Sequence, residues 1–303
     1  MNKHGAQNTG KTIKRILSYM KKYKFRFIFV LICIFLSAVA NVAGSMFIGT
    51  LIDDYITPLL GSTNPVFTGL LKAICVMGIV YLVGILATLF YNRTMVSIAQ
   101  GVLKKIRDEM FEHMQTLPIK FFDTHTHGDI MSFYTNDTDT LRQMISQSIP
   151  QTLSSIFTVV SVFCSMLTLS IWLTLFLIAF LFVMFKIVGK VEFDKRNDDL
   201  FTNASEANKF ANILGPIMNA LGYFLYVLIA VLGGGLALAG VPNMTLTGMG
   251  VMTLGGIASF LQLSRSFVMP ISQVTQQISS IIMAMAGASR IFSLLDAESE
   301  KDE

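Results

Sequence analysis

The sequence predicts an all-α membrane protein with six transmembrane helices and cytoplasmic helical extensions. Only 14% of the 303 residues are charged, whereas about a quarter of an ordinary soluble domain is charged. Uncharged windows recur along the chain, and each is long enough to cross about 30 Å of hydrocarbon as a helix. Lysine and arginine gather in alternate connections between these windows, which is typical of a polytopic membrane protein.

The first two spans are predicted on either side of an acidic turn. Residues 27–52 contain no charged side chain and end before Asp53 and Asp54. Residues 66–91 contain one charge, Lys72, close to the start, where a long side chain can reach the interface. Two windows of sufficient length therefore give two transmembrane helices.

Two longer uncharged windows, at 143–185 and 210–264, exceed a single crossing and are expected to fold as hairpins. The first gives spans over 150–168 and 171–188. The second gives spans over 210–239 and 249–285, separated by an uncharged, turn-rich break from Gly240 to Gly248. Residues 27–290 thus form one six-helix membrane domain, with a C-terminal linker over 291–303.

The orientation follows from the basic residues, because short cytoplasmic segments carry an excess of them. Residues 1–26 are rich in lysine and arginine, as are the connections after the second and fourth spans, whereas the other turns are acidic or neutral. Both termini of this multi-pass protein are therefore predicted to lie in the cytoplasm, with the chain in the cell (plasma or inner) membrane. The basic charges are split among several edges, so lipid is the predicted partner and nucleic acid is not.

Residues 1–26 are predicted to form a cytoplasmic tail and an interfacial elbow helix. The apolar residues recur at three- and four-residue spacing opposite a basic face, which suits a helix lying in the membrane interface; they are Ile13, Ile16, Leu17, Met20 and Tyr23. A disordered basic tail is the alternative.

The longest polar connection is predicted to form a stalk. The second span continues as an amphipathic helix to 117, where Pro118 ends it. Its apolar residues recur at three- and four-residue spacing; they are Ile98, Val102, Ile106, Met110, Phe111, Met114 and Leu117. A short cross-piece follows, and a returning helix begins near Asn136 and Asp137. A tip held away from the bilayer indicates a partner there, although a solvated loop without a partner is the alternative. His125 and His127 lack further ligands nearby in sequence, so no metal site is predicted.

This stalk resembles the first intracellular loop of ABC exporter transmembrane domains. The matching stretch is LKKIRDEMFEHMQTLPIKFFDTHTHGDIMSFYTNDTDTLR, residues 103–142. Three further stretches resemble the same family: Gly49–Asp53 the end of its first helix, Ile257–Phe267 with Pro270 its sixth, and Ala288–Asp296 the exit toward its nucleotide-binding domain. Together these matches extend over nearly the whole chain.

The resemblance implies half of an exporter, which pairs with a second half as a homo- or heterodimer and is driven by ATPase domains. It also implies a coupling helix at the stalk tip that docks on a nucleotide-binding domain. Gly128 would allow the turn, Asp129 would cap the next turn, and Ile130, Met131 and Phe133 would form the apolar plug. The implied coupling residues are Thr124, His125, Thr126, His127, Gly128, Asp129, Ile130, Met131 and Phe133.

The sequence departs from that family in two respects. It contains no G-x-x-x-x-G-K-[ST] phosphate-binding loop, so no cofactor is predicted on this chain, and ATP and Mg²⁺ belong to a partner nucleotide-binding domain. The connection after Lys190 is also short, where the family has a long second intracellular loop. The chain is therefore interpreted as lacking the nucleotide-binding domain and most of that loop.

Polar residues inside the spans are candidates for the substrate path, because such groups face protein or a water-filled cavity. In the first span these polar residues recur every four residues. In the last two spans they include Arg265, the only charged residue between Lys209 and Arg290. The candidates are Ser37, Asn41, Ser45, Asn219, Gln262 and Arg265. Hydrogen bonding between helices is the alternative for the small polar groups. The alternatives to an ATP-driven exporter are an ATP-independent channel or scaffold, and a truncated transporter without function.

Overall fold

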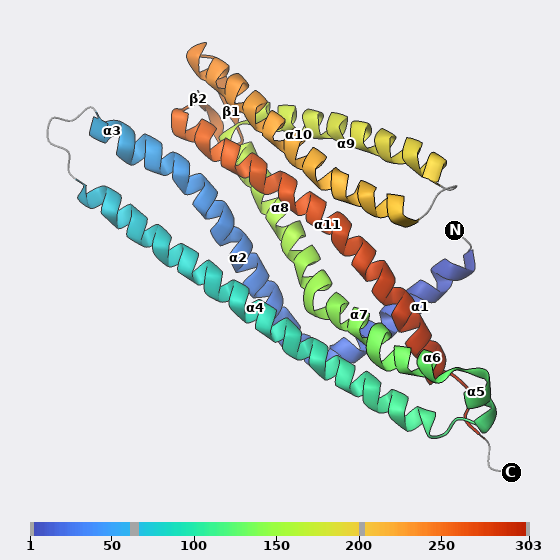
Figure 1. Ribbon diagram of the computed structural model, residues 1–303. Helices are drawn as coiled ribbons and strands as arrows, with labels where there is room; N and C mark the ends of the chain where they lie inside the picture. The colour runs from blue at the N-terminus through green and yellow to red at the C-terminus, as the bar shows by residue number, and fades with distance from the viewer. Residues whose placement is uncertain (1–2, 61–66, 200–203, 301–303) are drawn as a thin grey trace. The chain divides into compact units, whose positions relative to one another are not determined.

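The computed structural model describes residues 3–60, 67–199 and 204–300, without the side chains at 3–9, 185, 187–219, 272, 275 and 279 (Figure 1). The chain divides into two compact units. Unit 1 contains residues 1–38, 82–157 and 271–303, and unit 2 contains residues 39–81 and 158–270. The boundaries between the two units fall inside long helices, which are continuous across them.

The described chain is almost entirely helical. Two π-helical turns, Phe133–Asp137 and Met144–Ser148, join α6, α7 and α8, and further irregular turns at Lys21–Tyr23 and Leu51–Ile56 flank α2. The α-helices are α1 Lys3–Met20, α2 Lys24–Thr50, α3 Thr57–Leu60, α4 Thr68–Met114, α5 Ile119–Thr124, α6 His127–Ser132, α7 Thr138–Gln143, α8 Ile149–Leu169, α9 Ile171–Asp199, α10 Ala204–Leu238 and α11 Leu254–Leu295.

Within the described residues, five helical segments are long and apolar enough to cross a membrane: Gly10–Leu60, Thr68–Met114, His127–Leu169, Ala220–Leu238 and Leu254–Leu295. The all-α membrane fold predicted from the sequence is confirmed. The span expected at 171–188 falls on α9, whose described apolar part is the shorter stretch Ile171–Met184. The count of six spans therefore stays a prediction.

A β-hairpin replaces the start of the last predicted span. Strands β1, Pro242–Thr245, and β2, Gly248–Val251, pair antiparallel with Thr245 opposite Gly248. The amide of Leu246 donates to the Leu167 carbonyl at 3.0 Å, and the Asn243 side-chain amide donates to the Leu169 carbonyl at 2.7 Å. The hairpin thus satisfies carbonyls that the end of α8 leaves unpaired. Because the hairpin occupies residues 242–251, α11 begins at Leu254 and not at 249.

The second half of α4 has the predicted amphipathic face. Met95, Ile98, Val102, Ile106 and Met110 are fully buried and belong to the unit 1 core, together with residues of α1, α2 and α11. Phe111 is different, because 61% of its surface is exposed although it was expected on the same apolar face. The helix also ends at Met114, a turn before the predicted end at 117.

The N-terminal segment forms an ordered helix, α1, that is bonded within unit 1. The Arg15 guanidinium donates to both carboxylate oxygens of Asp296 at 2.7 and 2.9 Å. The Tyr19 hydroxyl donates to Glu109, and its ring stacks on Phe292 with centroids 6.2 Å apart. The elbow helix therefore contacts both α4 and the end of α11. The first residues of the linker predicted from 291 belong to α11, which ends at Leu295.

In unit 2, α2 and α11 approach each other closely at glycines. The Gly49 amide donates to the Ser259 hydroxyl at 2.7 Å, and the Gly255 amide donates to the Asp53 carboxylate at 2.9 Å. A Cβ on Gly49 would lie 2.6 Å from the Ser259 Oγ and 2.9 Å from the Gly255 carbonyl oxygen. The Asp53 carboxylate also lies at the N-terminus of α11, where a negative charge is stabilised by the helix dipole.

Candidate functional sites

The stalk tip is formed by two short helices that meet at an extended break. α5 ends at Thr124, and His125 and Thr126 have extended backbone, with φ of −116° and −70°. The Thr126 hydroxyl oxygen accepts a hydrogen bond from the Asp129 backbone amide at 3.1 Å, and the hydroxyl donates one to the Asp129 carboxylate at 2.7 Å. This reciprocal cap begins α6 at His127, and its hydrogen bond lowers the pKa of Asp129.

The structure corrects the expected form of the cross-piece. The returning helix begins at His127 and not near Asn136, because Thr126 supplies its N-cap. Gly128 lies inside that helix, so it does not make the turn. The short helix that is not part of the returning helix is α5, which Figure 1 shows at the far end of the stalk. Its last residue, Thr124, is bonded back to the Lys120 carbonyl at 3.1 Å.

The three residues expected to form an apolar plug differ in exposure. Ile130 and Phe133 are buried within the chain itself, because they lie on the inward face of the returning helix. Met131 is 59% exposed, and Ile119 on α5 is more exposed still. Among the described residues of the tip, these two side chains are therefore the large apolar groups available to a partner. The His125 ring packs within the tip itself, stacked on the Phe121 ring with centroids 4.1 Å apart.

An ion pair that sequence reasoning missed fastens the stalk to the end of α11. Arg290 Nη1 lies 3.5 Å from Asp137 Oδ2, and the guanidinium lies over the Phe133 ring at 5.2 Å. A Cβ on Gly287 would lie 3.2 Å from Asp137 Oδ1, so glycine allows this close approach. Burial raises the pKa of Asp137, and Arg290 opposes the rise. The signal was present in the sequence, since both charged residues lie in the stretches that resemble the exporter family.

The C-terminal segment lies against the same stalk. The His113 ring nitrogen Nε2 is 3.0 Å from the Ala297 carbonyl, and the Glu300 amide donates to the Thr116 carbonyl at 2.8 Å. The Thr116 and Ser299 hydroxyls are 3.0 Å apart. The residues that follow α11 are therefore held beside the loop between α4 and α5.

Two of the polar candidates in the first span are used for local bonding. In unit 1 the Ser37 and Thr88 hydroxyls are 2.7 Å apart, which joins α2 to α4. In unit 2 Ser45 is buried and donates to the Asn41 carbonyl at 3.2 Å. The Asn41 side chain is exposed. The side chain of Asn219 lies outside the described residues.

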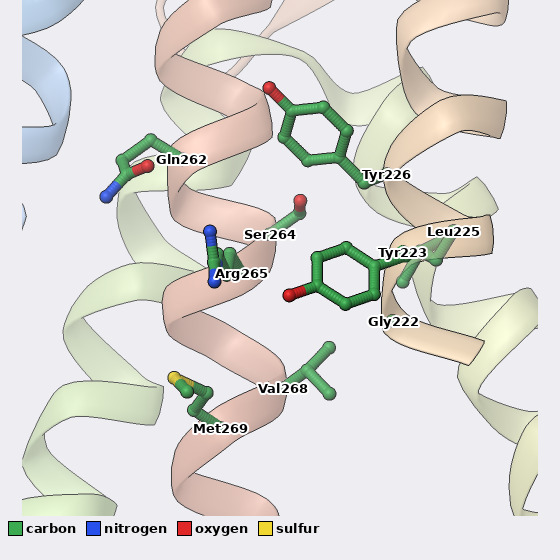
Figure 2. A pocket seen from close by; sticks show the side chains of 9 residues that line it. All are labelled: Gly222, Tyr223, Leu225, Tyr226, Gln262, Ser264, Arg265, Val268 and Met269. Carbon is green, nitrogen blue, oxygen red and sulfur yellow. The ribbon is translucent and has the colours of Figure 1, made fainter. Parts of the chain in front are cut away.

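Gln262 and Arg265 line a pocket in unit 2. The pocket has a volume of about 210 Å³ and lies between α10 and α11; its lining residues are Gly222, Tyr223, Leu225, Tyr226, Gln262, Ser264, Arg265, Val268 and Met269. Figure 2 shows Tyr223 and Tyr226 reaching from α10 toward α11. The Arg265 guanidinium lies 5.8 Å from the centre of the Tyr223 ring, and in the described part of the chain no carboxylate forms an ion pair with it.

Comparison with known proteins identifies the family. The model of the ABC transporter transmembrane region matches residues 27–191, which is more than half of the chain. The chain belongs to the ABC transporter transmembrane family. It is thus an ABC transporter transmembrane domain and a multi-pass membrane protein. The family match ends at 191, next to the position where the sequence has a short connection after Lys190.

Several bacterial ABC transporters are similar to this chain. An uncharacterized ABC transporter ATP-binding protein, YfiC, from Bacillus subtilis is 29% identical over 98% of the chain and 54% of its own length. A fatty acid ABC transporter ATP-binding/permease protein from Mycobacterium bovis is 25% identical over 67% of the chain and 38% of its own length. An ATP-dependent lipid A-core flippase from Idiomarina loihiensis is 29% identical over 46% of the chain and 23% of its own length.

The chain spans about half the length of the Bacillus relative and a smaller part of the other two. The alignment with the Bacillus relative extends over 341 positions, more than the 303 residues of this chain. That relative therefore contains residues with no counterpart here, within the aligned region itself.

Proposed function

We propose that this ABC transmembrane domain forms half of the substrate path of an ATP-driven exporter. ATP and Mg²⁺ would be bound by a partner nucleotide-binding domain, and a second transmembrane half would complete the path. Coupling to the ATPase would occur at the stalk tip, over Thr124–Phe133. The observation that carries this proposal is the exposure of Met131 at the tip, on a stalk that Arg290 and Asp137 fasten to α11.

The pocket around Arg265 is the part of the structure that best fits a substrate path. A guanidinium inside a transmembrane segment costs about 2.5–3.5 kcal/mol or more in hydrocarbon, and such residues face a cavity or a polar partner. Arg265 has donors left for a ligand, while Val268 and Met269 supply an apolar wall. This combination favours an amphiphilic cargo with an acidic group. The names of the two relatives that handle a fatty acid and lipid A-core agree with a lipid-like cargo.

The test of coupling uses Met131, because Ile130 is buried and its replacement would disturb the stalk itself. A Met131→Asp chain should fold normally but bury an unpaired charge when its tip docks, at roughly 2 kcal/mol or more. Recovery of the ATPase partner should fall by at least tenfold. Phe111→Asp is the matched control, since Phe111 is similarly exposed at 61% on α4.

The measurement is co-purification of a P-loop ATPase with the tagged chain from membranes of its own cells. Mass spectrometry would identify the ATPase, and its ATP hydrolysis would report the amount recovered. Equal recovery with the Met131→Asp and unchanged chains would contradict docking at this tip. Equal losses with Met131→Asp and Phe111→Asp would contradict the specific role of Met131.

The proposed orientation places both termini and the stalk tip in the cytoplasm, as the basic residues indicate. Leu246 lies in the exposed loop of the β-hairpin, and His127 is exposed at the stalk tip. In intact cells, a membrane-impermeant thiol reagent should label a Leu246→Cys chain and leave a His127→Cys chain unlabelled until the membrane is opened. Labelling of His127→Cys in sealed cells would reverse the orientation.

A further inference from the structure

A second pocket lies in unit 1, between the first turns of α2 and the middle of α4. It has a volume of about 480 Å³ and is lined by Phe25, Arg26, Phe29, Arg93, Thr94 and Ser97. None of these residues belongs to the stalk tip or to the pocket around Arg265. The groove combines two guanidinium groups with two aromatic rings, a mixture that the transport proposal leaves unexplained.

Both arginines lie at the same predicted edge of the membrane. Arg26 immediately precedes the uncharged window 27–52, and Arg93 comes directly after the window 66–91 and Asn92. The two windows run in opposite directions across the bilayer, so the end of one lies level with the start of the other. The Arg26 guanidinium donates to the Ser97 hydroxyl at 3.4 Å, which confirms that the two helices are adjacent at this level.

The positive charge in the groove is not neutralised within the described chain. Arg26 makes a long bond to Ser97 and lies 5.9 Å from the centre of the Tyr23 ring. Among the residues that the structure describes, no Asp or Glu forms an ion pair with Arg26 or Arg93. Two guanidinium groups on one groove match a phosphate, since arginine binds phosphate oxygens through paired N–H donors.

Apolar side chains border the same groove. Phe25 is 77% exposed, and Phe29 and Phe90 are 45% and 49% exposed on the neighbouring surfaces of α2 and α4. A soluble anion would gain nothing from these rings, whereas the acyl chains of a lipid would cover them. A zwitterionic headgroup would also bring an ammonium group close to two arginines, with no carboxylate nearby to receive it. An anionic phospholipid fits both halves of the groove.

We propose that Arg26 and Arg93 form a binding site for the phosphate of an anionic phospholipid, whose acyl chains lie against Phe29 and α4. Basic pockets between transmembrane helices bind such headgroups. This site is independent of the transport proposal, because it needs neither an ATPase nor a cargo.

The experiment measures lipid retention by native mass spectrometry of the detergent-purified chain titrated with phosphatidylglycerol. An Arg26→Gln/Arg93→Gln chain should bind phosphatidylglycerol roughly tenfold more weakly than the unchanged chain. Lys21→Gln/Lys22→Gln is the matched control, because it removes the same charge from neighbouring exposed positions that do not line the groove. This control should retain the lipid. An Arg26→Lys/Arg93→Lys chain keeps the charge without the paired donors and should bind at an intermediate strength.

The outcomes separate the possible occupants. If Lys21→Gln/Lys22→Gln weakened lipid binding as much as Arg26→Gln/Arg93→Gln does, the proposal would be overturned, because the lipid would then be attracted to the basic surface in general. Unchanged binding by Arg26→Gln/Arg93→Gln would also overturn it. Equally tight binding of phosphatidylcholine would contradict the preference for an anionic lipid. Competition by inorganic phosphate or glycerophosphate at the lipid's own concentration would show a site for a soluble anion instead.

Discussion

A Gly49→Val chain should be the least stable of the single variants considered for this protein. The new side chain would place its Cβ 2.6 Å from the Ser259 Oγ and 2.9 Å from the Gly255 carbonyl oxygen. The second neighbour is backbone, so it cannot rotate away, and α2 must separate from the start of α11. Overpacking of this kind costs about 1–3 kcal/mol.

Separation of α2 from α11 would also break two hydrogen bonds at once. The bonds from the Gly49 amide to Ser259 and from the Gly255 amide to Asp53 both depend on the close approach. Hydrogen bonds between membrane helices contribute about 0.6 kcal/mol each on average. The combined loss should lower the temperature at which the detergent-solubilised chain aggregates, as measured by size-exclusion chromatography after heating.

Gly78→Val is the matched control for this variant. Gly78 lies in α4, also in unit 2, and a Cβ there would meet no atom within 4 Å. The control should therefore retain the stability of the unchanged chain. If Gly49→Val aggregated at the same temperature as Gly78→Val, the close packing of α2 on α11 would be contradicted.

The long elements of this fold were predictable because they depend on properties that are local in sequence. Uncharged windows give helices in lipid, where every backbone polar group must be bonded internally. The three- and four-residue spacing of Ile98, Val102 and Ile106 likewise predicted the buried face of α4. The four stretches that resemble the exporter family also have physical roles: Gly49 and Asp53 contact the start of α11, and Asp137 contacts its end.

The features that could not be predicted depend on partners distant in sequence. The hairpin at 242–251 contains few typical strand residues, and its contacts with the last carbonyls of α8 were not visible in the sequence. Phe133 was expected to face a partner, but Arg290 covers its ring. At the tip, the spacing of Thr126 and Asp129 was a readable capping signal. The expectation that Gly128 makes the turn is wrong, because the Thr126 cap begins the helix at His127.

If this domain is half of an ATP-driven exporter, ATP must change which side of the membrane has access to the path through it. The pocket at Gln262 and Arg265 offers a direct measurement that requires no knowledge of the cargo. Gln262 is exposed and lines the pocket, so Gln262→Cys would report its accessibility. The three native cysteines, Cys33, Cys75 and Cys164, would first be replaced by alanine.

The labelling rate of Gln262→Cys by a membrane-impermeant maleimide would be measured in vesicles that contain the chain and its ATPase partner. We expect the rate to change several-fold when ATP, Mg²⁺ and vanadate trap the closed ATPase, because the population of one state must shift toward the other. Leu246→Cys, in the hairpin loop, should be labelled at a constant rate. An unchanged rate at Gln262, in vesicles where the partner hydrolyses ATP, would contradict the claim and favour an ATP-independent channel or scaffold.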